Sequence, residues 1–135
     1  MVLRLDEIYQ KTEFLNPLTG PPANCIGTGL YLFGLTEKDG LNEDLIRVYD
    51  DYLKKLEFLN KPQLCSLVSW EKIRKRKNNI EVVHLGIVSS LNPLKVIHRQ
   101  GAWSSKRNGL VVESFFEDVD KTYSSFSDSV SYYSS

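Results

Sequence analysis

The chain has 135 residues, 41% of them hydrophobic and 25% charged, which is ordinary for one soluble globular domain. Its 17 basic and 17 acidic residues cancel, so the domain as a whole has no electrostatic preference for nucleic acid or for an anionic membrane. No apolar run approaches the roughly 20 residues that cross a bilayer, and residues 1–7 lack the pattern of a secretory signal. We therefore expect no nucleic-acid or membrane partner, and a location in the cytoplasm or export by a signal-independent route.

Helical patterns dominate the first half of the chain. Apolar spacing predicts a helix over residues 3–15, and a proline-rich loop follows over residues 16–23. Residues 25–35 are too apolar for a surface helix and predict a buried one, with Asn24 as its N-cap. A third helix is expected from an N-cap at Asn42 to residue 56, with acidic residues in its first turn and lysines in its last.

Strand patterns dominate the second half. The sequence predicts a short helix over residues 117–123, after the strands. Residues 124–135 contain seven serines. We expect this segment to be a poorly ordered tail unless it docks. Helices followed by strands predict an α+β domain over residues 1–123, with helices packed on an antiparallel sheet. The predicted strands cover residues 63–70, 80–88, 94–99 and 110–115.

Cys25 lies where a thiol can act as a nucleophile. At the first turn of a helix, free N–H groups and the helix dipole stabilise a thiolate, so we expect a pKa below the usual value of ~8.5. The same turn can hold an oxyanion, and Asn24 and Gly27 are predicted to shape it by close packing or as donors. The alternative is that Cys25 is a small buried apolar residue. Cys65, in the middle of a predicted strand, is expected to be structural.

The two histidines are predicted to meet on one sheet. His84 lies in the middle of an apolar strand, where a polar side chain needs a partner, and Gly86 leaves space beside it. In a hairpin centred on Leu91, His84 would face His98 directly, at a Cβ separation of about 4.5–5.5 Å. The second imidazole could then orient the first, as in a catalytic triad. A core histidine with a backbone partner is the alternative.

Cys25, His84 and His98, in this order, resemble the catalytic set of the NlpC-type cysteine peptidases of the papain-like superfamily. The resemblance rests on the segments NCIGTG at 24–29 and HLGIV at 84–88, followed by His98. It implies a papain-like fold, with Cys25 as nucleophile, His84 as base and His98 as the orienting residue. It also implies hydrolysis of an amide bond through a thioester, without a cofactor, on a peptide or amide substrate such as a cell-wall peptide.

Other functions compete with this one. A protein that keeps the fold without the chemistry would act as a binding module, and thiol reactivity of Cys25 would separate the two. A structural zinc site could use both cysteines and both histidines, but their spacing lacks the close pairs of known zinc sites, so no metal is expected. The basic run at residues 72–77 could bind nucleic acid or anionic peptides, although a solvated loop is the favoured interpretation.

Overall fold

A computed structural model describes residues 4–16, 23–42, 44, 46–100 and 109–135. The helices predicted at residues 3–15, 25–35 and 117–123 are confirmed within a few residues. Asn24 caps the second helix, since its side-chain oxygen accepts a hydrogen bond from the Gly27 N–H, and Gly34 ends it with a φ of 88°. The helices are α1 (Leu5–Leu15), α2 (Cys25–Phe33), α3 (Arg47–Asp51) and α4 (Phe116–Tyr123).

The third predicted helix is largely wrong. Instead of running from Asn42 to residue 56, α3 covers Arg47–Asp51 and is followed by a 3₁₀ turn at Leu53–Lys55. Asn42 does not cap it because its backbone is tied to the Asn24 side chain, which donates to the Asn42 carbonyl at 2.7 Å. Most of the predicted proline-rich loop, at 17–22, lies outside the described residues.

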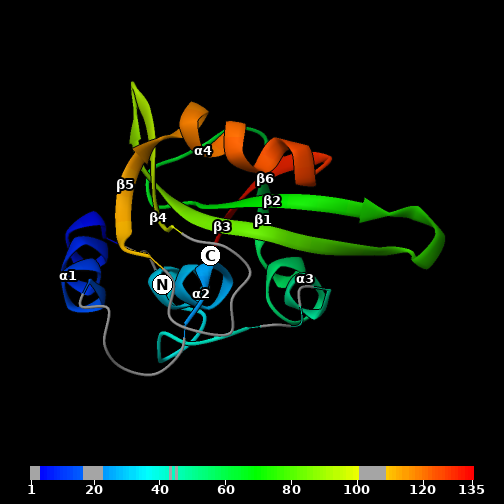
Figure 1. Cartoon of the computed structure of the whole chain (residues 1–135), viewed down its shortest axis with the longest axis horizontal. Coiled ribbons are helices and arrows are strands. Elements are labelled where there is room, and N and C mark those ends of the chain that lie inside the picture. Colours follow the sequence, from blue (N-terminus) through cyan, green and yellow to red (C-terminus); the bar gives the residue numbers. More distant parts are fainter. Residues whose placement is uncertain (1–3, 17–22, 43, 45, 101–108) are drawn as a thin grey trace.

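The strands form one six-stranded antiparallel sheet, in the order β1-β6-β2-β3-β4-β5. Half of residues 72–79, which lie between two predicted strands, also belong to strands, because β2 and β3 stay paired as far as Arg74 and Asn79. This long hairpin projects from the body of the molecule (Figure 1). The strands are β1 (Glu57–Leu59), β2 (Leu67–Arg74), β3 (Asn79–Leu91), β4 (Leu94–Arg99), β5 (Val111–Phe115) and β6 (Ser129–Ser134).

The serine-rich segment docks into the sheet and is not a separate tail. β6 lies between β1 and β2 and pairs with both. The buried carboxylate of Glu71 on β2 accepts hydrogen bonds from Ser131 at 2.9 Å and from Tyr133 at 2.6 Å. The alternation of residues in SVSYYS also suits a strand, since Tyr132 and Tyr133 pack on opposite faces of the sheet.

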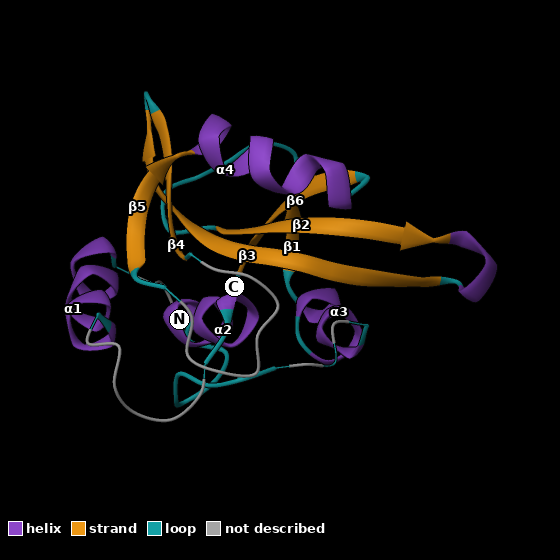
Figure 2. Cartoon of the chain, in the orientation of Figure 1, coloured by secondary structure: helices purple, strands orange, loops and turns teal. Residues whose placement is uncertain are grey.

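Two hydrophobic cores lie on the two faces of the sheet. α4 covers one face, while α2 and α3 lie on the other side and α1 lies beside β5 (Figures 1 and 2). The α2-side core includes Ile26, Leu30, Leu85 and Ile87. The α4-side core consists of Val68, Trp70, Val83, Val88, Val96, Val119 and Tyr123.

In the described part of the chain, no helix is long and apolar enough to cross a membrane.

Close packing at the first turn of α2 predicts an asymmetric response to two glycine substitutions. A Cβ atom on Gly27 would overlap the carbonyl group of Gly40, whereas a Cβ on Gly40 would meet no atom within 4 Å. Gly27→Ala should therefore lower the free energy of unfolding by about 1–3 kcal/mol, even though alanine is the better helix former. Gly40→Ala is the matched control and should stay within about 0.5 kcal/mol of the parent in denaturant unfolding. Equal stability of the two variants would contradict the packing described here.

Candidate active site

His84 and His98 meet on one face of the sheet, but not in the predicted register. Ile87 pairs with Ile97 and Val88 with Val96, so the pairing is shifted by two residues from a hairpin centred on Leu91. The turn is centred between Asn92 and Pro93, which shifts the pairing by three residues, and the irregularity between Val88 and Ser90 takes one residue back. Because a two-residue shift keeps each side chain on its face, the histidines become diagonal neighbours instead of direct partners.

The two imidazole rings form a hydrogen-bonded chain. His84 Nε2 lies 2.9 Å from His98 Nδ1, and His98 Nε2 lies 3.3 Å from the Ser114 hydroxyl on β5. Gly86 lies against His98: a Cβ atom placed there would be 3.4 Å from the His98 Cβ. The missing side chain at Gly86 therefore leaves room for the His98 ring to lean toward His84.

His84 Nδ1 is a buried polar atom without a hydrogen-bond partner among the described residues. His84 itself is fully buried. Buried polar atoms are paired in the great majority of cases, so an unpaired ring nitrogen calls for a functional or structural explanation. Burial and, after it, the neighbouring His98 hold the pKa of His84 well below 6.5. Burial lowers the pKa of His98 to about 4, so both rings are neutral at pH 7.

Aromatic side chains from β2 and α4 enclose His84. The Tyr123 ring stacks on the His84 ring at 3.8 Å between centroids, and Trp70 lies at 5.4 Å. The indole N–H of Trp70 donates to Asp120 at 3.0 Å, which fixes α4 over this part of the sheet. Trp70 and Tyr123 were not predicted as site residues, because no local pattern in the sequence links positions 70 and 123 to position 84.

Cys25 is the first residue of α2, as predicted, but it is not poised as a thiolate. It is 8% exposed and belongs to the α2-side core. Burial raises the pKa of the Cys25 thiol to about 12, although the N–H groups of Ile26 and Cys25 and the charge of Arg99 act in the opposite direction. The expectation of a lowered pKa is therefore wrong for this conformation, because desolvation outweighs the helix N-terminus.

The two residues predicted to shape the first turn of α2 do so by packing and capping. Gly27 packs against Gly40, and its N–H donates to the Asn24 side chain at 2.9 Å. That N–H is therefore already engaged and is not an oxyanion donor. The Asn24 amide group donates to Asn42. The backbone N–H groups of Ile26 and Cys25 act on the thiol and lower its pKa.

No contact between Cys25 and His84 is observed among the described residues. Their surroundings differ: Cys25 packs in the α2-side core, while His84 contacts Trp70 and Tyr123 of the α4-side core. Tyr123 borders both residues. Its ring lies on His84, and burial followed by the charge of an ionised Cys25 raises the pKa of Tyr123 to about 12.

Cys65 lies apart from this site. It precedes β2 with a φ of 65°, so its predicted place in the middle of a strand is wrong. It lines a hollow with Phe33, the last residue of α2, whereas Cys25 is the first. Within the described ranges, no three side chains of the metal-binding types form a group that could hold a metal ion. The basic run lies at the exposed tip of the β2–β3 hairpin, where Arg74 pairs with Glu81 at 3.7 Å.

Comparisons with known proteins found no relative of this chain. No family model matches the chain, and no match was found among curated proteins or solved structures.

Proposed function

We propose that this chain is a cysteine hydrolase that cleaves an amide bond, with Cys25 as nucleophile, His84 as general base and His98 as the residue that orients His84. The observation that carries the proposal is the His84–His98 pair. One nitrogen of the buried His84 is held by His98 at 2.9 Å, and the other has no partner among the described residues. A base needs this combination of a fixed ring and a free lone pair.

The hydrogen-bonded chain suits one assignment of protons. If His84 Nε2–H donates to His98 Nδ1, then His98 carries its proton on Nε2 and donates to Ser114. His84 Nδ1 is then a bare acceptor, able to take the thiol proton. The opposite assignment would bury an unpaired N–H at Nδ1, and it would leave no base.

Proton transfer must accompany attack in this site. With a protonated thiol and neutral imidazoles, Cys25 loses its proton to His84 as the sulfur attacks the substrate carbonyl carbon. The N–H groups of Cys25 and Ile26 would stabilise the oxyanion. His84 then passes the proton to the departing amine, which leaves a thioester on Cys25. Water activated by His84 hydrolyses the thioester and restores the thiol.

The resemblance to the NlpC-type peptidases agrees with this assignment and suggests the class of substrate. It supports a papain-like arrangement of the α+β fold and a peptide substrate, of which γ-glutamyl cell-wall peptides are one kind. A catalytically silent binding protein of the same fold is the second candidate, and the missing hydrogen bond between Cys25 and His84 favours it.

Trapping of the acyl-enzyme separates these two functions. The full chain is incubated with a panel of peptidyl and γ-glutamyl coumarin amides, quenched in acid and digested for mass spectrometry. A hydrolase should release the fluorescent amine and carry an acyl group on the Cys25 peptide. A panel that yields neither product, with folding confirmed by circular dichroism, would favour the binding protein.

The role of His98 predicts a graded loss of activity. His98→Ala should lower kcat by about 10²- to 10³-fold, less than the ~10⁴ seen when a serine triad loses its orienting member, because sulfur is the better nucleophile. His98→Gln should recover part of this loss, since its amide oxygen can accept the His84 N–H. Ser114→Ala is the control, because Ser114 is the last member of the hydrogen-bonded chain, and it should lower kcat a few-fold at most. The measurement is kcat of each variant from steady-state kinetics. Full activity of His98→Ala would mean that the site is a Cys25–His84 dyad.

A further inference from the structure

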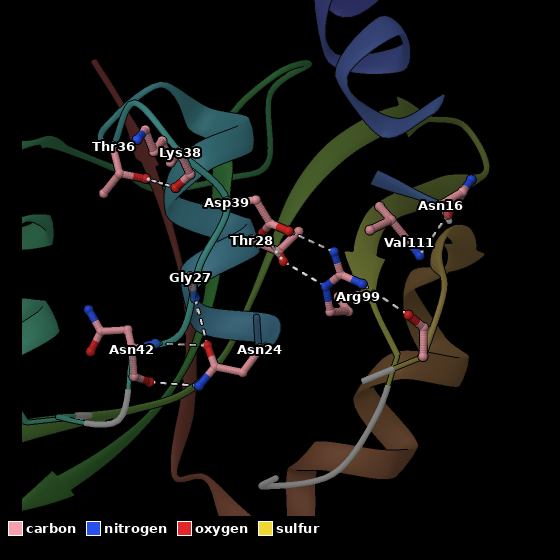
Figure 3. A network of polar contacts seen from close by, with 11 residues as sticks. Asn16, Asn24, Gly27, Thr28, Thr36, Lys38, Asp39, Asn42, Arg99 and Val111 are labelled. Carbon is pink, nitrogen blue, oxygen red and sulfur yellow. Dashed lines mark hydrogen bonds and ion pairs between the residues drawn. The ribbon is translucent and has the colours of Figure 1, made fainter. Parts of the chain in front are cut away.

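Arg99 is a fully buried cation next to His98 in β4. Its Nε donates to the Thr28 hydroxyl at 2.7 Å, one terminal nitrogen donates to Asp39 at 2.9 Å and the other to the Gly109 carbonyl at 3.0 Å (Figure 3). Burying a charge costs several kcal/mol unless it is paired and hydrogen-bonded. The engagement of all three guanidinium nitrogens therefore explains how this position can carry an arginine.

The partners of Arg99 hold the helix turn that carries Cys25. The Thr28 N–H donates to the Asn24 carbonyl in the first turn of α2, and the Thr28 hydroxyl donates to Asp39 at 2.5 Å. The loop after Asp39 runs along the same turn, where the Asn24 N–H donates to the Gly40 carbonyl at 3.1 Å. Arg99 thus joins α2, this loop and β4 around the start of the helix (Figure 3).

The geometry points to a positioning role for Arg99: through Thr28 and Asp39 it fixes the first turn of α2 against β4, and its charge favours the thiolate of Cys25. This inference rests on the proposed function, in which Cys25 is the nucleophile. It adds a residue that acts on the nucleophile from within the protein.

The charges around Cys25 give the inference a sign. The charge of Arg99 lowers the pKa of the thiol, and Asp39 is the ion-pair partner of Arg99 at 2.9 Å. Tyr123 from α4, whose pKa responds to Cys25, is neutral at pH 7, and so is His84, on which it stacks. Removing the positive charge should therefore disfavour the thiolate, and removing the negative charge of Asp39 should favour it.

Alkylation of Cys25 by iodoacetamide measures this effect without any substrate. In a Cys65→Ser background at pH 9, the rate is followed by mass spectrometry of the Cys25 peptide, and hydrogen exchange of the α2 amides reports the opening of the helix. Arg99→Met should slow alkylation about tenfold, which corresponds to a pKa rise of about one unit. Asp39→Asn should accelerate it several-fold, and Arg99→Lys, which keeps the charge, should stay within about two-fold of the parent.

A merely structural role would give a different pattern. Loosening of α2 exposes Cys25, so every variant would react faster, in step with faster hydrogen exchange; this result would overturn the inference. If Arg99→Met does not fold, Asp39→Asn decides, and a rate equal to or below that of the parent would also overturn it. Because no substrate is involved, this test can fail while hydrolysis is found, and it can succeed while hydrolysis is absent.

Discussion

Replacing Cys25 with alanine should abolish amide hydrolysis, with a loss of about 10⁴-fold or more in kcat/KM, because no other group can form the thioester. Cys65→Ala is the matched control and should keep activity within a few-fold. Cys65 lies half-buried before β2, near the opposite end of α2 from Cys25. The measurement is release of the fluorescent amine from the most reactive substrate of the panel, with folding checked by circular dichroism.

Two results would contradict this expectation. Equal losses from the two variants would point to a shared structural role for both cysteines. Unchanged hydrolysis in Cys25→Ala would remove the nucleophile from the proposal, and His84 would then be a base acting directly on water.

Ending the chain after Phe126 should prevent stable folding, because β6 pairs with both β1 and β2. The deletion also leaves the buried Glu71 carboxylate without the hydroxyl groups of Ser131 and Tyr133. A domain of this size is stable by about 5–15 kcal/mol, and the loss of a central strand together with an unpaired buried carboxylate exceeds that margin. Size-exclusion chromatography and urea unfolding should show an expanded or aggregated chain.

Point variants grade the same effect. Tyr133→Phe removes one donor to Glu71 and should lower the free energy of unfolding by about 1–3 kcal/mol. Phe126→Ser, at a half-exposed side chain just before β6, should change it by less than about 0.5 kcal/mol. A truncated chain as stable as the parent would mean that β6 adds nothing to the sheet.

Local patterns in the sequence predict much of the fold and of the candidate site. The apolar spacing of α1 and the Asn24 cap of α2 are local features, and local physics is enough to predict them. The strand at 94–99 is observed with its predicted bounds. The shared face of His84 and His98 was predicted from a hairpin centred on Leu91. It is observed because the turn and the irregularity between Val88 and Ser90 together shift the register by two residues, an even number.

The remaining features depend on distant contacts. Asn42 is a good N-cap by sequence, but its backbone N–H and carbonyl are hydrogen-bonded to the Asn24 side chain instead. This contact moves the start of α3. The burial of Cys25, which reverses the direction of its pKa shift, depends on how α2 packs against the sheet. Arg99 follows a predicted site residue, yet its partners Thr28 and Asp39 lie 71 and 60 residues away. No spacing rule reaches that far.

The interior position of β6 in the sheet also matters during synthesis, because β6 is made after both strands with which it pairs. The ribosome makes β2 well before residues 129–134, and at about 5–20 residues per second the delay amounts to several seconds. During that time the edge of β2 that will receive β6 has no partner, and unpaired strand edges join to other chains. β6 therefore both completes the sheet and covers the edge of β2 at which nascent chains would otherwise associate.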